Sequence, residues 1–232
     1  MNADQLTAGK TIWDLLKRLW EKPRRRILIL AVVLQVVVVC ACCPQASGQT
    51  AAAGPVLGAR AYILVDVDSG QVLYGRSIYQ PMPPASTTKI MTAILTLDYL
   101  DLDEEAIVSQ RAAHTPPSGI GLKAWQKMRV EDLLKAVLVT SANDASVVLA
   151  ERIAGSEELF TYLMNKKALI IGARSTSFKN ASGLPARDHL STCYDLAVMS
   201  RFALRNPVFA ETVALTKTTI QHPDYPPGKT IS

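Results

Sequence analysis

Two short groups of polar residues near the middle of the sequence could together activate a hydroxyl group for attack on a carbonyl. The first group is Ser86-Thr87-Thr88-Lys89, in which Ser86 and Lys89 share one face if the segment is helical. A serine hydroxyl is a weak nucleophile until a base removes its proton. A lysine amine can be that base once burial lowers its pKa. The spacing therefore predicts a nucleophile and its base one helical turn apart.

The second group, Ser141-Ala142-Asn143, falls in a short connection between two predicted helices. Its hydroxyl could relay a proton between base and leaving group, and its amide could hold a peptide carbonyl. Each group alone is ordinary, because serine and asparagine are common in loops and caps and Ser-x-x-Lys also describes a capped helix with a surface lysine. The hypothesis of catalysis depends on both groups occurring in this order and setting.

The elements around Ser86 place it at the start of a buried helix. Residues 81–84 (Pro-Met-Pro-Pro) exclude a helix before it. Residues 89–100 carry apolar side chains on nearly every face, which is typical of a helix buried on all sides. The N–H groups at such a helix start could also stabilise negative charge on the attacked carbonyl.

The remaining pattern indicates an α+β domain over residues 57–232. A hairpin is predicted from residues 61–67, a turn at 68–70 and residues 71–74. Helices are predicted at 130–139, 144–154 and 157–171, with Glu157 and Glu158 as solvated acids of the first turn, and from the capping box of Thr192 and Asp195 to about Leu204. A stable sheet usually needs about three strands, and residues 222–232 carry no strand pattern of useful length. We therefore expect helices packed on an antiparallel sheet whose C-terminal strands are missing from this chain.

The N-terminal residues read as an export segment. Residues 1–26 hold seven basic residues against three acidic ones, a net charge of +4 out of +5 for the chain. The apolar residues 27–43 follow as a signal-peptide core or a membrane anchor, and residues 44–56 as a linker. Residues 1–26 would stay in the cytoplasm and the body would lie on the extracytoplasmic face of the membrane.

Several functional classes are disfavoured by composition. A nucleic-acid-binding domain carries its basic residues on the folded body, whereas residues 27–232 are close to neutral. Cys193 is the only cysteine of the body, which excludes a disulfide framework there. The three histidines (His114, His189 and His222) are far apart in sequence, so no metal site is predicted.

With both polar groups in place, the sequence resembles a known family. Ser-x-x-Lys followed by Ser-x-Asn is a signature of β-lactamases and penicillin-binding proteins. Residues 84–92 resemble the nucleophile segment of the low-molecular-weight D-Ala-D-Ala carboxypeptidases of peptidase family S11. Residues 133–145 and 188–197 resemble two further segments of that family, in the same order.

The resemblance implies a cell-wall hydrolase without a cofactor. Its substrate is the D-Ala-D-Ala end of a peptidoglycan stem peptide, which Ser86 attacks to form an acyl-enzyme. Lys89 is then the general base, Ser141 the proton relay and Asn143 a substrate-binding group. β-Lactam antibiotics, which mimic the dipeptide, are expected to acylate Ser86.

The family's third motif, Lys-Thr-Gly on a strand beside the cleft, does not occur in these 232 residues. Lys229-Thr230-Ile231 has isoleucine in place of the small residue and is not taken as that motif. Two alternatives therefore stay open. One is an inactive remnant or binding protein with half of the cleft, and the other is a β-lactamase, for which no acid with a positioned water is evident.

Overall fold

The structure is a computed structural model, and it describes residues 57–232. The predicted cytoplasmic segment (1–26), export segment (27–43) and linker (44–56) lie outside the described residues. No helix among residues 57–232 has the length and apolar character needed to cross a bilayer. In chain order the elements are β1 (Tyr62–Val65), β2 (Val72–Arg76), the 3-10 helix η1 (Ala85–Thr88), α3 (Lys89–Tyr99), β3 (Glu105–Ile107), α4 (Gln110–Ala113), β4 (Lys127–Arg129), α5 (Val130–Val139), α6 (Asn143–Ala154), α7 (Glu157–Ile171), α8 (Cys193–Leu204), α9 (Pro207–Val213), β5 (Thr218–Ile220) and β6 (Lys229–Ile231).

The helices begin and end where local chemistry favours it. The Ser156 hydroxyl accepts the Leu159 amide at the start of α7, and the Thr192 hydroxyl accepts the Asp195 amide at the start of α8. Gly155 and Gly172 follow α6 and α7 in the left-handed region that glycine adopts without strain. The predicted helices agree with these bounds to within one residue at each start.

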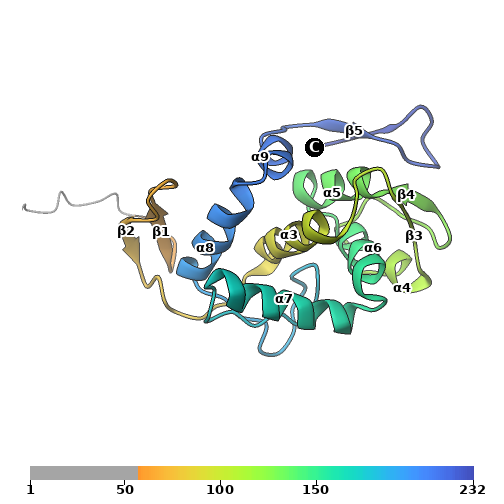
Figure 1. The fold of residues 1–232 in the computed structure, drawn as a ribbon. Helices are drawn as coiled ribbons and strands as arrows, with labels where there is room; N and C mark the ends of the chain where they lie inside the picture. Colours follow the sequence, from red (N-terminus) through yellow and green to blue (C-terminus); the bar gives the residue numbers. More distant parts are fainter. Residues whose placement is uncertain (1–56) are drawn as a thin grey trace, which may run out of the picture. The chain divides into compact units, whose positions relative to one another are not determined.

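Helix α3 lies at the centre of the helical part, in contact with α5, α6, α7 and α8 (Figure 1). Its Met91, Ala93 and Leu95 are almost fully buried, because the surrounding helices cover every face that its apolar sequence presents. One core cluster joins α3 to α7, α8 and α9, and a second joins α5 and α6 to β3, β4, β5 and β6. A central helix packed from several sides offers a rigid base for the residues at its first turn.

The strands form three separate two-stranded antiparallel sheets within the described residues: β1–β2, β3–β4 and β5–β6. Short strands joined in pairs explain why only the hairpin β1–β2 was predicted. The expectation that residues 229–231 lie outside any strand was wrong, since they form the three-residue strand β6 and pair with residues 218–220 of β5.

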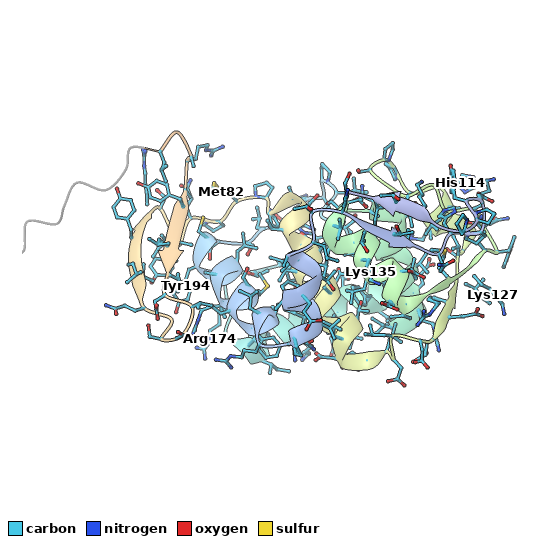
Figure 2. All side chains as sticks on the ribbon, turned by 90° about the horizontal axis from the view of Figure 1, so that it is seen from above. Met82, His114, Lys127, Lys135, Arg174 and Tyr194 are labelled. Atoms are coloured by element: carbon cyan, nitrogen blue, oxygen red, sulfur yellow. The ribbon has the colours of Figure 1, made fainter. Side chains whose placement is uncertain are left out.

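The segment that leads from β2 to Ser86 is hydrogen-bonded to the residues at and just before the start of α8. Met82 and Ser191 exchange two backbone hydrogen bonds, of 2.8 and 2.9 Å, and the Tyr194 amide donates to the Ile78 carbonyl. Figure 2 shows Met82 and Tyr194 at the end of the domain that carries β1 and β2, with His114 and Lys127 at the opposite end. These contacts set the position at which the chain turns into η1.

Candidate active site

Ser86 lies in the short 3-10 helix that leads into α3, with its side chain exposed. The residue before it, Ala85, has a φ of 48°, a left-handed conformation that is costly for a residue with a β-carbon. The turn presents the Ser86 hydroxyl at the surface while the next helical turn enters the core. An exposed hydroxyl at the start of a buried helix is accessible to a substrate.

Lys89 begins α3 and is almost fully buried, with only 3% of its surface exposed. Its Nζ donates to Asn143 Oδ1 and to the Ser182 carbonyl, both at 2.7 Å. Burial lowers the pKa of Lys89 from 10.5 to about 8, and the Asp144 charge opposes the shift. Both hydrogen-bond acceptors are neutral, and no carboxylate among the described residues forms an ion pair with the amine.

Ser141 lies in the short connection between α5 and α6. Its φ is 58°, again a left-handed conformation, and its Oγ is buried without a hydrogen-bond partner among the described residues. The connection is held by the Ala142 amide, which donates to the Ala136 carbonyl at 3.1 Å. A strained residue with an unpaired buried hydroxyl is the kind of feature that structures retain at functional sites.

Asn143 has its side-chain amide fixed from two sides. Its Oδ1 accepts from Lys89, and its Nδ2 donates to the Pro116 carbonyl at 3.1 Å. Its backbone amide donates to the Ser118 carbonyl at 2.7 Å. The amide group has two N–H donors, and within residues 57–232 only one of them has a partner.

Three of the four predicted site residues line one open cleft of about 450 Å³. One wall carries Ser86, Lys89 and Ser141 together with apolar residues of α3 and α5, and the other wall is formed by residues of α8 and α9. The lining residues are Ser86, Thr87, Lys89, Ile90, Val137, Leu138, Ser141, Ser200, Leu204, Phe209 and Val213. Asn143 lies behind Lys89 and is joined to it by the hydrogen bond. No hydrogen bond links Ser86 to Lys89 in the described part of the chain, where the amine has two other acceptors.

Sequence reasoning missed the contribution of a turn far along the chain. The Ser182 carbonyl is one of the two acceptors of Lys89, although 93 residues separate them. A backbone carbonyl has no signature in the sequence, so the only available signal was the turn composition of Asn180-Ala181-Ser182-Gly183.

Two expectations about charged residues were wrong. Glu157 was expected to be solvated, but it is 9% exposed, accepts the Ala181 amide at 2.9 Å and pairs with Arg111. Lys229 was expected to lie outside any strand, but it begins β6. Its Nζ donates to the Ile120 carbonyl at 2.6 Å and lies 4.7 Å from the centre of the Tyr225 ring. Neither Glu157 nor Lys229 lines the cleft.

The three histidines lie in separate environments. His189 is buried, its Nε2 is 2.8 Å from Thr88 Oγ1, and its Nδ1 accepts the Lys179 amide. Since Nδ1 is the acceptor, Nε2 carries the proton and donates to Thr88. His189 thus holds the side chain of Thr88, the residue next to Lys89, by a hydrogen bond. Burial lowers the pKa of His189.

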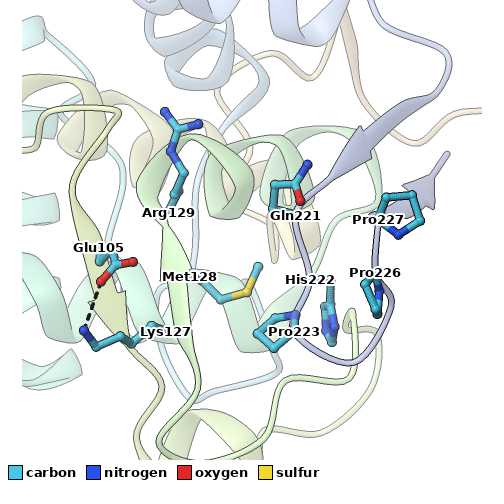
Figure 3. A pocket seen from close by; sticks show the side chains of 9 residues that line it. All are labelled: Glu105, Lys127, Met128, Arg129, Gln221, His222, Pro223, Pro226 and Pro227. Carbon is cyan, nitrogen blue, oxygen red and sulfur yellow. Dashed lines mark hydrogen bonds and ion pairs between the residues drawn. The ribbon is translucent and has the colours of Figure 1, made fainter.

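A second open pocket lies between β4 and the β5–β6 connection (Figure 3). It is lined by Glu105, Lys127, Met128, Arg129, Gln221, His222, Pro223, Pro226 and Pro227. Lys127 and Glu105 form an ion pair at its edge. None of the predicted site residues lines this pocket. Ser86 and Lys89 of the first polar group and Ser141 of the second line the cleft described above instead.

Comparison with known proteins assigns the family. Residues 48–223 match the model of the peptidase S11 family, described as D-alanyl-D-alanine carboxypeptidase. The D-alanyl-D-alanine carboxypeptidase DacF of Bacillus subtilis is 39% identical over 172 residues, which cover 72% of this chain and 43% of that protein. DacB2 of Mycobacterium tuberculosis is 38% identical over 158 residues, covering 67% of this chain and 54% of that protein. The chain thus spans about half the length of these curated relatives.

Solved structures agree with this assignment. A D-alanyl-D-alanine carboxypeptidase from Mycobacterium tuberculosis is 34% identical with a TM-score of 0.72, over 76% of this chain and 67% of that one. Penicillin-binding protein 6B from Escherichia coli is 29% identical with a TM-score of 0.70, over 78% and 59% of the two chains. The predicted α+β class and penicillin-binding-protein fold are therefore confirmed. By sequence and by fold, this chain belongs to the D-alanyl-D-alanine carboxypeptidase family, peptidase S11.

Proposed function

We propose that the protein removes the terminal D-alanine from peptidoglycan stem peptides through an acyl-enzyme on Ser86. The observation that carries the proposal is the meeting of Ser86, Lys89 and Ser141 in one cleft, with the lysine amine buried between neutral acceptors. The family assignment supports the substrate class, because the relatives are named as D-alanyl-D-alanine carboxypeptidases.

In the first step Ser86 Oγ bonds to the carbonyl carbon of the penultimate D-alanine and its proton passes to the neutral amine of Lys89. The carbon–nitrogen bond to the terminal D-alanine then breaks, and Ser141 relays a proton to the departing amine. Water next attacks the ester, which releases the shortened peptide and restores the Ser86 hydroxyl. Asn143, the substrate-binding group that the family resemblance implies, does not line the cleft itself and is joined to it through its hydrogen bond with Lys89.

The lowered pKa makes this role feasible near neutral pH. With a pKa of about 8, roughly a fifth of the Lys89 amines are neutral at pH 7.4. With the ordinary value of 10.5, only about 0.1% would be neutral. Burial at the start of α3 therefore increases the fraction of competent base by about two orders of magnitude.

Labelling of the full chain with a fluorescent penicillin tests the proposal. The expected result is a covalent adduct on the native chain and none on Ser86→Ala. A matched control is Ser200→Ala, which removes another hydroxyl that lines the cleft and should leave the adduct intact. A native, folded chain without any adduct would reject the proposal and favour the non-catalytic binding protein.

A β-lactamase would lose its adduct by rapid hydrolysis, which requires an acid that activates water at the ester. Lys89 is the only charged side chain among the described residues of the cleft, and Glu157 is engaged elsewhere. A long-lived penicillin adduct therefore distinguishes the carboxypeptidase from the β-lactamase.

The proposed setting is the extracytoplasmic face of a bacterial membrane, where peptidoglycan and β-lactam antibiotics are encountered. The support is the charge pattern of residues 1–26 ahead of the apolar residues 27–43. The proposed partners are the stem peptide, β-lactams as acylating inhibitors and the membrane, with no nucleic acid.

A further inference from the structure

A turn at residues 180–184 lies directly against the backbone that precedes Ser86. Gly183 has a φ of +88°, and a β-carbon at this position would overlap the carbonyl oxygen of Ala85 and lie 3.0 Å from the Ser86 amide nitrogen. Any side chain at Gly183 must therefore displace the peptide group that carries the nucleophile. The absence of a side chain at this position lets the two backbones touch.

The contact occurs where the nucleophile segment is strained. Ala85 has its φ at 48°, a conformation that persists in a residue with a β-carbon only when the surroundings determine it. Gly183 is the neighbour that touches the Ala85 carbonyl. The turn thus contacts the strained residue on which the direction of the Ser86 side chain depends.

The same turn also meets the first turn of α3. The Ser182 carbonyl accepts from Lys89 Nζ at 2.7 Å, and the Ala181 carbonyl accepts from Thr92 Oγ1 at 2.6 Å. Three consecutive residues of the turn therefore contact the nucleophile, the base and the following helical turn. Lys89 and Ser86 are placed relative to each other through a shared neighbour as well as through their own backbone.

The turn owes its shape to Asn180. Its Oδ1 accepts from the Gly183 amide at 2.7 Å and from the Ser182 amide at 3.2 Å, and its Nδ2 donates to the Leu184 carbonyl at 2.8 Å. One side chain thus bonds to three successive residues of the turn. Beyond it, the buried Glu157 accepts the Ala181 amide.

We propose that Asn180 and Gly183 are positioning residues of the active site: they hold the turn that sets Ser86 and Lys89 in register. The inference deepens the proposed function and rests on it. The two residues touch neither substrate nor reacting atoms, and they act through the peptide group before Ser86 and the carbonyl that accepts from Lys89.

Comparison of Gly183→Ala with Gly155→Ala in the full chain tests the role of Gly183. Gly155 has a φ of +77° with no atom within 4 Å of a β-carbon, so its alanine variant has the same backbone strain without the clash. Both variants should lower the Tm. Acylation by fluorescent penicillin should fall at least about 100-fold in Gly183→Ala, since a misplacement of about 1 Å can cost that factor, and should change by less than about twofold in Gly155→Ala.

Asn180→Ala and Asn180→Asp test the shape of the turn with less disturbance of packing. The alanine variant should slow the bond-forming step of acylation about tenfold while the preceding reversible binding of penicillin stays unchanged. Aspartate retains an acceptor for the Gly183 amide, so it should recover part of that rate. Loss of binding and rate together in both variants, in proportion to the loss of Tm, would indicate a purely structural residue and overturn the proposal.

Hydrogen exchange of the backbone around Ser86 separates failure of this inference from failure of the proposed function. In Gly183→Ala the peptide spanning residues 85–89 should exchange faster than in Gly155→Ala, whether or not the chain reacts with penicillin. If the two variants show this difference while the native chain forms no adduct, the proposed function is contradicted and the role of the Gly183 contact is supported. Equal exchange in the two variants, or equal acylation of them in a reactive chain, would overturn the inference.

Discussion

The two walls of the cleft differ in what they can do. One wall presents Ser86, Lys89 and Ser141, and their segments are held by hydrogen bonds to residues far away in the sequence. The other wall, from α8 and α9, presents Leu204, Phe209 and Val213 together with Ser200, whose hydroxyl donates to the Leu196 carbonyl. The polar side chains of the proposed reaction thus lie on one wall, while the other wall is mainly apolar surface against which a ligand can rest.

Lys89→Met gives the largest expected effect on this contrast. The variant keeps the volume and removes the base, so penicillin acylation should fall about 10³-fold, within the range for general-base catalysis. Lys135→Met is the matched control, because Lys135 pairs with Glu131 on α5 and does not line the cleft. Equal acylation rates in Lys89→Met and Lys135→Met would show that Lys89 is not the base.

Ser141→Ala should reduce acylation about 10²-fold without lowering stability. The hydroxyl that it removes is buried and unpaired within the described residues, and loss of an unsatisfied buried group does not destabilise a fold. Ser146→Ala provides the contrast, because Ser146 Oγ donates to the Ala142 carbonyl at 2.8 Å and its removal should cost about 1 kcal/mol in the free energy of unfolding. A thermal melt and a labelling time course on both variants check the expectation; a large stability loss in Ser141→Ala would show that the hydroxyl has a structural partner.

The pH dependence of acylation should follow Lys89. Burial lowers the pKa of its amine to about 8, so the neutral, reactive fraction grows as pH rises and levels above that value. From pH 6 to pH 8 the rate should increase about 50-fold, in proportion to the neutral amine. Stopped-flow measurement of acylation across this range checks the sign, and a flat profile would show that the amine is not the base.

The smallest effect is expected on the apolar wall. Val213 lines the cleft with 42% of its surface exposed, so Val213→Ala removes little buried area and should change stability by less than about 0.5 kcal/mol. The acylation rate should change less than about twofold. A tenfold loss of rate would mean that this wall contributes to the reaction, and would end the distinction between the two walls.

Local patterns predicted the five longer helices of the described residues, whereas the short helices α4 and α9 were not predicted. The all-round apolar sequence of α3 and the cap at Thr192 each depend on neighbouring residues, which is why the predicted bounds agree with the structure. The three-residue strands were missed because so short a run has no readable alternation. The pairing of β5 with β6 depends on a contact between residues separated by a proline-rich connection.

In the candidate site, too, some residues could be predicted from the sequence and others could not. Ser86, Lys89 and Ser141 could be proposed from type and spacing, and their shared cleft agrees with that hypothesis. The Ser182 carbonyl and the contact of Gly183 with Ala85 could not be proposed, since backbone groups have the same chemistry at every position and only the fold selects which of them matter. The burial of Glu157 was missed for a similar reason, because its partners come from Arg111 and the turn near residue 181.

The long separation between Lys89 and the Ser182 carbonyl also has a consequence for biosynthesis. The serine leaves the ribosome almost a hundred residues before its supporting turn, and contacts of such long range form late. During that interval the emerging polypeptide carries its hydroxyl on an unfinished scaffold without a positioned amine. The arrangement proposed for the reaction is therefore complete only when the second half of the described domain has folded onto the first.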